Sequence, residues 1–253
     1  MPKKERLTDQ AYHGILQLVE EGHFRDDRGI SFNRLSDRLK MSRMPVSIAV
    51  DRLERDGVLE SIPRLGTRVQ RMDAETIWGL IRWRIALECE IAREASLQIS
   101  RADGERLIEA GLRTDEDLER IAPGVQELKT LVNSGRGNSP EAAELMHSIS
   151  ARRLGLRYDN EFHLLLAELS GVKKLRTELA RFMDVFPVKV AVCEAVEATV
   201  AYTVPNEYPP MHEDLARAVI DGDPDQASTL MRRHIENSVF IFGFQQWYRR
   251  YRR

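Results

Sequence analysis

The stretch Met41-Ser-Arg-Met-Pro-Val-Ser-Ile-Ala-Val-Asp-Arg-Leu-Glu-Arg-Asp-Gly57 decides the fold of the first part of this chain. Ser42 is a good N-cap, Pro45 suits the first helical turn, and Gly57 is a typical residue after the last turn. Apolar residues at helical spacing predict an inner face: Val46, Ala49, Val50 and Leu53. The intervening side chains are expected to face solvent: Arg43, Met44, Ser47, Asp51, Arg52 and Arg55.

The neighbouring sequence predicts the partners of this helix. A helix is expected from Leu7 to Glu21, and a second, short one begins near Ser31. After the stretch, residues 58–62 and 67–70 read as two short strands, joined through Pro63–Gly66 by a turn that contains glycine. Three short helices followed by a β-hairpin predict a winged helix-turn-helix. Its third helix is sized for the major groove of DNA.

Three motifs in this region carry a family resemblance. Leu35-Ser-Asp-Arg-Leu-Lys-Met-Ser-Arg-Met-Pro-Val46, Leu53-Glu-Arg-Asp-Gly-Val-Leu-Glu60 and Arg64-Leu-Gly-Thr-Arg-Val69 resemble the DNA-binding head of GntR-type bacterial transcription regulators. The resemblance covers nearly all of residues 1–71, which we call the head. It implies a double-stranded DNA operator as partner.

The resemblance also assigns roles to residues of the head. Arg43 would read bases or phosphate at the start of the recognition helix, with Met44 beside it. Arg52 would lie on the DNA backbone, and the wing tip from Arg64 to Gly66 would approach the minor groove. Arginine suits guanine edges and phosphates, and Gly66 lets the wing backbone come close. Ser47 stands where the family usually has arginine, which predicts an altered operator.

Composition and charge support two domains. The chain has 253 residues, of which 42% are hydrophobic, and a formal net charge of -2. Residues 1–71 contain 14 Lys and Arg against 11 Asp and Glu, whereas residues 72–253 are acidic. A slightly basic head suits a polyanion. We expect a DNA-binding domain over 1–71 and a second domain over 72–253.

Targeting and cysteine signals point to the cytoplasm. The sequence shows no secretory signal, and the best membrane-span candidate, Val185–Val204, is interrupted by charged residues and proline. Cys89 and Cys193 have no metal-ligand spacing and suit buried free thiols in a reducing compartment. We therefore expect a cytoplasmic protein that does not contact membranes.

Residues 72–253, which we call the body, are predicted to form an all-α helical bundle, because no strand pattern follows the hairpin. Residues 102–112 and 114–132 read as separate helices, the second opening at Thr114-Asp-Glu-Asp117 and kinked or broken at Pro123. Residues 173 to about 200 are also helical, with a break expected near Pro187.

Four side chains in the body form a candidate metal site. Asp159 and His163 are one turn apart on one helix face, and Phe162 lies on the same side. His212 and His234 also fall on apolar faces of their helices. One carboxylate and three imidazoles can hold a borderline divalent ion such as zinc, nickel or manganese.

Arg84 occupies the middle of an apolar helix stripe, with Glu88 nearly beneath it. One interpretation is an Arg–Glu ion pair, which would contribute only about 0.3–0.5 kcal/mol on a surface. Because a surface pair should not occupy the apolar face, we favour Arg84 as a buried anion receptor.

Five segments of the body resemble the FCD ligand-binding domain of the FadR branch of the GntR family: Arg84-Ile-Ala-Leu-Glu88, Asp159-Asn-Glu-Phe-His163, Ala167-Glu-Leu-Ser-Gly171, Met211-His-Glu-Asp-Leu215 and 218–234. That domain often holds a metal through one Asp and three His, and all four positions match. The resemblance further implies a small carboxylate effector on the open side of the metal, with Arg84 in the place of the family's arginine. It thus implies that residues 72–253 form an effector- and metal-binding, dimerising domain. This chain departs from the family by extra sequence near 101–112 and 135–156.

Together these features predict a ligand-responsive transcription regulator, and more specifically a repressor, that binds a palindromic operator as a homodimer. It is not expected to be an enzyme and has no predicted catalytic residues. One alternative is a metal-dependent hydrolase, since an open metal position could activate water. The other is a DNA binder whose metal is purely structural.

Overall fold

The computed structural model describes residues 6–20, 23, 29–63, 66–137, 139–145, 148, 157–191, 193, 211–238, 244–245 and 248–249. They form two compact units. The first contains Met1–Asp73 together with Asp184–Glu194, and the second contains Ala74–Met183 and Ala195–Arg253.

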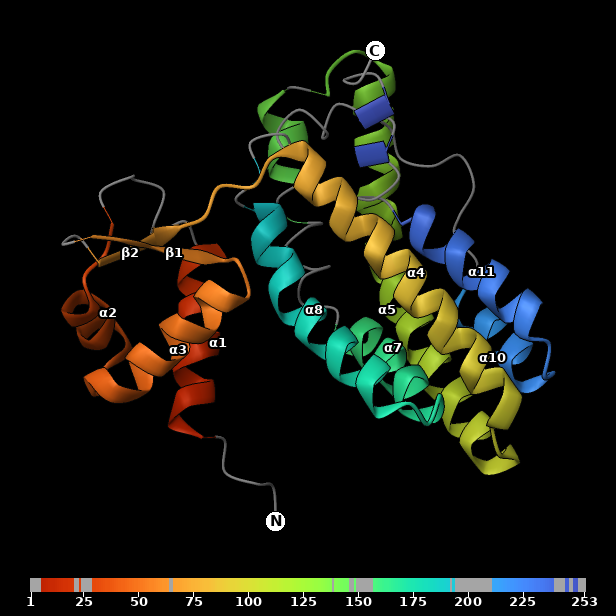
Figure 1. Ribbon diagram of the computed structural model, residues 1–253. Helices are drawn as coiled ribbons and strands as arrows, with labels where there is room; N and C mark the ends of the chain where they lie inside the picture. The colour runs from red at the N-terminus through yellow and green to blue at the C-terminus, as the bar shows by residue number, and fades with distance from the viewer. Residues whose placement is uncertain are drawn as a thin grey trace. The chain divides into compact units, whose positions relative to one another are not determined.

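Among its described residues, the first unit contains α1 (Leu7–Glu20), α2 (Phe32–Leu39), α3 (Arg43–Arg55), a hairpin of β1 (Leu59–Ile62) and β2 (Gly66–Val69), and the C-terminal end of α8 (Lys173–Ala191) (Figure 1). The two strands are antiparallel, with Leu59 opposite Val69 and Ile62 opposite Gly66. The predicted winged helix-turn-helix is therefore confirmed, and each boundary lies within about two residues of its predicted place.

One hydrophobic cluster holds the first unit together. Tyr12 of α1, Leu35 of α2 and Leu53 of α3 are fully buried in it, and Val185 and Val188 from the 184–194 segment belong to the same cluster. Each such side chain contributes on the order of 1.5–3 kcal/mol through its burial.

Tight packing within the first unit requires glycine at position 66. Its φ is +105°, and a Cβ atom there would lie 2.3 Å from the carbonyl oxygen of Ile30. That close approach allows Ile30 and Thr67 to exchange two backbone hydrogen bonds of 2.7 and 3.0 Å, which tie the segment before α2 to the wing. A side chain at position 66 would disrupt this pairing.

The regular secondary structure among the described residues of the second unit is α-helical. Its helices are α4 (Ala74–Gln98), α5 (Arg101–Asn133), α7 (Arg157–Leu169), most of α8 (Lys173–Ala191), α10 (His212–Ile220) and α11 (Pro224–Glu236). α4 packs along α11 and α7, and α10 packs against both α5 and α11 (Figure 1). The predicted all-α body is confirmed.

The expected division of 102–132 into two helices is wrong. α5 is one helix of 33 residues that continues through Pro123. Thr114 is buried and donates its hydroxyl to the carbonyl oxygen of Ala110 at 2.9 Å, so it lies inside the helix rather than capping a new one. The segment 101–112 is therefore the first half of a core helix, in which Leu107 is fully buried.

α8 likewise continues through Pro187 to Ala191, so the break expected at this proline does not occur. α11 begins as predicted, with the Asp223 side chain accepting from the backbone N–H groups of Asp225 and Gln226. The expected helical continuation over 194–200 lies outside the described residues. No helix in the described part of the chain is long and apolar enough to span a membrane.

Candidate functional site

The four predicted metal ligands come together inside the second unit. Asp159 and His163 come from α7, His212 is the first residue of α10, and His234 lies in the last turn of α11. One candidate ligand atom from each lies within 4.8 Å of the others. The three histidines are buried, and Asp159 is partly exposed.

The imidazole rings face one another around this cluster. The ring centroids of His212 and His234 are 4.4 Å apart, and those of His163 and His234 are 5.4 Å apart. Nε2 of His212 lies 3.3 Å from Oδ1 of Asp159, and Nε2 of His163 lies 4.0 Å from the same oxygen. The Asp159 carboxylate thus lies between two imidazole nitrogens.

The buried nitrogens of the cluster fit a metal ion. Nε2 of His163 and Nε2 of His212 are buried and make no hydrogen bond within the described residues. A buried polar atom without a partner is costly, and a divalent cation would satisfy both nitrogens. One carboxylate and three imidazoles are a donor set suited to zinc, nickel or manganese.

Asp115 orients His212 and was not identified from the sequence. Its Oδ1 accepts from Nδ1 of His212 at 2.8 Å and from the backbone N–H of His212 at 3.0 Å, while its Oδ2 accepts from the N–H of Glu213 at 3.0 Å. Asp115 therefore caps α10 from a neighbouring helix. A proton on Nδ1 leaves Nε2 free to face the cluster.

Gly111 allows this capping contact. A Cβ atom at Gly111 would lie 3.0 Å from the carbonyl carbon of His212. The absence of a side chain lets the start of α10 approach α5, and Asp115, one turn later on the same face, then reaches the first N–H groups of α10. In the sequence, the sign of this contact is the spacing of Gly111 and Asp115, which are four residues apart and therefore lie on one face of a helix.

Negative charge surrounds His212. Burial alone would lower the pKa of His212, but the carboxylates of Asp115 and Asp159 outweigh burial and raise this pKa to about 9. An environment that favours a bound proton so strongly also favours a metal cation, which competes with protons for the same nitrogens.

Arg84 and Glu88 form a buried pair beside the cluster. Nε of Arg84 donates to Oε1 of Glu88 at 2.6 Å, and the Glu88 side chain is completely buried. Oε2 of Glu88 contacts Nδ1 of His163. Burial would raise the pKa of Glu88, but His163 and Arg84 lower it to about 2. Arg84 is therefore buried and paired with Glu88. Its predicted role as an anion receptor stays a prediction.

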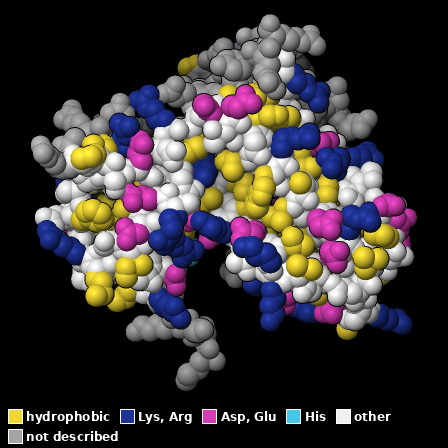
Figure 2. All heavy atoms as spheres, viewed as in Figure 1, with side chains coloured by type: hydrophobic (Ala, Val, Ile, Leu, Met, Phe, Trp, Pro, Cys, Tyr) yellow, Lys and Arg dark blue, Asp and Glu magenta, His cyan; other side chains and the backbone are white. Residues whose placement is uncertain are grey.

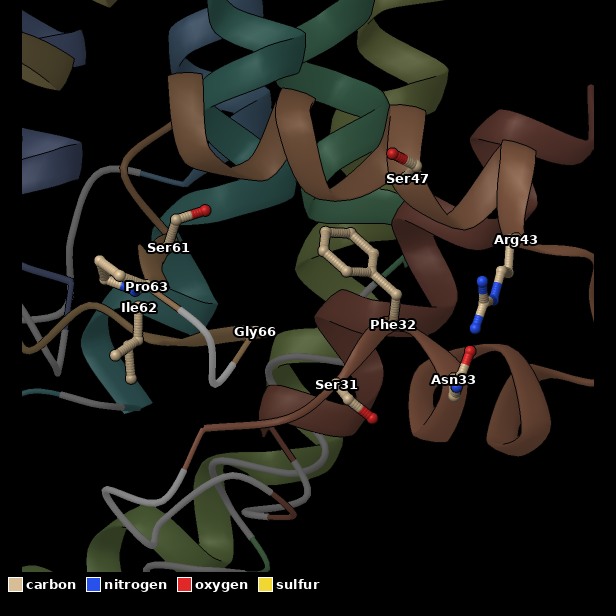
Figure 3. A pocket seen from close by; sticks show the side chains of 9 residues that line it. All are labelled: Ser31, Phe32, Asn33, Arg43, Ser47, Ser61, Ile62, Pro63 and Gly66. Carbon is tan, nitrogen blue, oxygen red and sulfur yellow. The ribbon is translucent and has the colours of Figure 1, made fainter.

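The predicted DNA-binding residues cluster on the first unit. Arg43 and Ser47 of α3 line a hollow of about 680 Å³ with Gly66 and residues from α2 and the wing. Figure 3 shows the side chains of Arg43 and Asn33 pointing toward each other at one side of this hollow. Arg64 lies outside the described residues.

The exposed face of α3 carries two apolar side chains. Met44 is 76% exposed and Ile48 is 46% exposed. Helical spacing in the sequence placed Met44 on this face but did not place Ile48 there, although the two residues are one helical turn apart. Over the face drawn in Figure 2, Lys and Arg side chains are interspersed with Asp and Glu.

Arg52 is held by α1. Nη1 of Arg52 lies 3.2 Å from Oδ1 of Asp9, and its guanidinium carbon lies 3.9 Å from the centre of the Tyr12 ring. The Tyr12 hydroxyl donates to Asp56 at 2.7 Å. These contacts restrict Arg52, which remains partly exposed. Its predicted contact with the DNA backbone is untested.

Two family models match the chain. The model described as "FCD domain" matches residues 80–237, which is more than half of the chain and includes all four residues of the cluster. The model described as "Bacterial regulatory proteins, gntR family" matches residues 7–69, from α1 to the end of the wing.

Curated relatives have names of the same kind. An uncharacterized HTH-type transcriptional regulator of Bacillus subtilis (strain 168), YdhC, is 25% identical over 175 residues, covering 69% of this chain and 66% of that protein. Another, from Mycobacterium tuberculosis (strain CDC 1551 / Oshkosh), is 33% identical over 79 residues, 30% of this chain and 32% of that protein. The chain thus spans less than two thirds of each relative.

Solved structures share the fold. The chain resembles E. coli McbR/YncC with a TM-score of 0.52 and 16% identity, covering 98% of this chain and 99% of that one. It also resembles a putative transcriptional regulator GntR from Rhodococcus sp. RHA1, with a TM-score of 0.55 and 20% identity, covering 95% and 97%. The family matches and the names of the relatives indicate a transcription regulator, not an enzyme. They therefore argue against the hydrolase alternative.

Proposed function

Because this chain belongs to the FCD family of GntR-type transcription regulators, we propose that it represses transcription by binding a palindromic operator as a dimer, and that it senses a small organic acid at a divalent metal site. The observation that carries the proposal is the cluster of Asp159, His163, His212 and His234 in the same chain as a winged helix-turn-helix. A regulator of this kind works in the cytoplasm, on chromosomal DNA.

Those four side chains would hold the metal. When bound, the ion supplies positive charge that attracts a carboxylate. His163 and His212 present Nε2 toward the cluster, and Asp159 contributes an anionic oxygen beside both. Zinc, nickel and manganese all accept such donors.

Arg84 would bind the effector carboxylate through the guanidinium nitrogens that Glu88 does not use. Its side chain is only 16% exposed, and burial strengthens an arginine–carboxylate pair relative to one in water. Burial also makes the site selective, because an uncharged ligand would leave this cation without an additional partner.

The head would read each half-site with α3. A dimer with two such heads suits half-sites one helical turn apart, about 34–36 Å. Arg43 at the start of α3 would contact base edges or phosphate, with Met44 and Ser47 beside it. Effector binding would alter operator affinity through a coupling free energy of about 1–3 kcal/mol.

The test combines operator selection with an effector screen. An operator is first selected from a random pool of double-stranded DNA by the full-length metal-loaded protein. Organic acids that raise its melting temperature are then added to an operator-binding titration. The proposal predicts a change in operator affinity of roughly 5–150-fold for at least one acid. If no organic acid changes the affinity, the alternative of a DNA binder with a purely structural metal holds instead.

Arg84→Ala separates the two parts of the site. The proposal predicts that this variant loses effector affinity. Metal content should persist, because Arg84 is not among the four ligands. Unchanged effector affinity in Arg84→Ala would remove Arg84 from the site while leaving the metal assignment intact.

A further inference from the structure

Glu88 occupies an unusual position for a carboxylate. It lies in the middle of α4, its side chain is completely buried, and its two oxygens have different partners. Oε1 accepts from Nε of Arg84 at 2.6 Å, and Oε2 contacts Nδ1 of His163 on α7. Burying a carboxylate costs several kcal/mol unless its partners compensate. Here the compensation comes from two groups with different proposed roles.

The contact with Oε2 fixes the useful tautomer of His163. A carboxylate oxygen only accepts hydrogen bonds, so Nδ1 of His163 must carry the proton where it meets Glu88. Nε2 is then the nitrogen with a free lone pair, and it is this nitrogen that faces Asp159 at 4.0 Å. Glu88 thus lies against Nδ1 of His163 as Asp115 lies against Nδ1 of His212. Within the described residues only the Asp115 contact has the direction of a hydrogen bond.

The two carboxylates differ in their remaining partners. Asp115 is otherwise bound by the backbone N–H groups of His212 and Glu213, which no ligand can displace without unwinding α10. Glu88 is otherwise bound by a guanidinium, whose charge an arriving anion would share. Of these two carboxylates, Glu88 is therefore the one that connects a predicted metal-binding histidine, His163, to a group that is able to bind an anion, Arg84.

We propose that Glu88 is a positioning residue that presents Nε2 of His163 to the metal and couples the metal site to anion binding at Arg84. This proposal rests on the proposed function. An anion on Arg84 draws the guanidinium away from Oε1, and Glu88 then holds His163 more strongly. Metal binding and anion binding therefore strengthen each other, and this coupling is the same in both directions.

Glu88→Gln tests the positioning role. The glutamine amide has the size of the carboxylate, but with its oxygen on Arg84 its NH₂ group faces Nδ1 of His163. The favoured tautomer of His163 then carries its proton on Nε2, which blocks metal ligation. We expect metal affinity to fall by about 10–100-fold, the usual range when such a partner of a ligand is changed. Zinc affinity is measured by competition with a chromophoric chelator, in a buffer free of carboxylates.

Two further measurements separate positioning from a general loss of structure. The melting temperature of metal-free Glu88→Gln should fall no further than that of metal-free Arg84→Gln, which breaks the same buried ion pair, whereas a general loss of structure would lower it further. Glu88→Asp keeps the charge but is one methylene shorter, so it cannot reach both partners, and its zinc affinity should also fall. Zinc affinity equal to that of the parent protein in either variant overturns the proposal.

A double-mutant cycle tests the connection to Arg84 without knowledge of the effector. Arg84→Gln is combined with Glu88→Gln and, as the matched control, with Asp115→Asn. Effects on zinc affinity should be non-additive by at least a few-fold in the first pair, because one substitution acts through the other residue. They should be additive in the control pair. Additive effects in the first pair overturn the coupling, whereas a parent protein that binds no zinc overturns the proposed function itself.

Discussion

The proposed DNA-binding surface and the proposed metal site of this chain are built in opposite ways. The side chains proposed to face DNA lie within six residues of each other on one helix and are exposed: Arg43, Met44 and Ile48. The metal cluster takes its residues from three helices, over positions 159 to 234, and its three histidines are buried. An exposed side chain can be changed with little effect on folding, whereas a buried ligand is also part of the core.

This difference predicts that changes to the two surfaces have separable effects. Changes in the cluster should alter both metal binding and the stability of the second unit. Changes on the exposed face of α3 should alter DNA affinity alone.

Removal of the metal should have the largest effect. At a free metal concentration about 1,000 times its dissociation constant, binding stabilises the folded protein by roughly 4 kcal/mol. We therefore expect a chelator to lower the melting temperature of the parent protein but not that of His163→Ala, which has no complete site. His13→Ala, which changes a histidine of the first unit, is the control and should respond like the parent protein. An equal response of His163→Ala to the chelator would contradict the assignment.

Gly66→Ala should destabilise the first unit by about 2–3 kcal/mol. The φ of +105° is strained for alanine, and the new methyl group would collide with the carbonyl oxygen of Ile30. Gly135→Ala is the matched control, because Gly135 also has a positive φ of +77° but has nothing within 4 Å of the added methyl group. Chemical denaturation of both variants should show the larger loss at position 66, with metal content unchanged. Equal losses would mean that the contact with Ile30 adds nothing to the backbone strain.

Arg43→Ala should weaken operator binding by about 1–3 kcal/mol, the usual contribution of an arginine that reads a base. Arg101→Ala, at a fully exposed position of α5, is the control for loss of one positive charge and should change operator affinity little. Fluorescence anisotropy at fixed salt concentration measures both. Metal content should be the same in the two variants, and a loss of metal in Arg43→Ala would break the separation between the surfaces.

Met44 and Ile48 should produce the smallest effect. Thymine offers a methyl group in the major groove, and each such contact contributes about 0.8 kcal/mol. Replacing the thymines of a selected operator with deoxyuracil should weaken binding of the parent protein. It should have less effect on the double variant Met44→Ala/Ile48→Ala. Equal weakening of both proteins would show that these side chains do not read thymine.

The fold of the head could be predicted because its signals are local. Ser31, Ser42 and Gly57 mark helix ends in the sequence, and the structure places the ends close to them. Gly66 was predicted at the wing for its approach to DNA, but its tight contact is with Ile30, thirty-six residues earlier. Sequence patterns cannot show which distant backbone a glycine accommodates.

The all-α fold class of the body could be predicted from the sequence, but the boundaries of its helices could not. Thr114-Asp-Glu-Asp117 has the composition of a helix start, so local propensity favoured a new helix there. Tertiary packing overrides that preference, because Gly111 and Asp115 face α10 and the helix continues beneath it. The role of Asp115 depends on a contact across 97 positions of the chain, which no local pattern contains.

The four cluster residues were identifiable because each histidine lies on an apolar helix face, where a polar group needs a partner. The supporting carboxylates were harder to identify. The spacing of Arg84 and Glu88 predicted a pair or an anion receptor, but not that Glu88 also contacts His163. A carboxylate with two partners on different helices becomes visible only when the helices are packed.

We propose that Asp159, His163, His212 and His234 together hold one metal ion. Elemental analysis of the purified full-length protein after dialysis tests it most directly, with His234→Ala measured in parallel. We predict about one zinc, nickel or manganese ion per chain in the parent protein and almost none in His234→Ala. A parent protein without bound metal, or a His234→Ala variant with the same metal content as the parent protein, would contradict it.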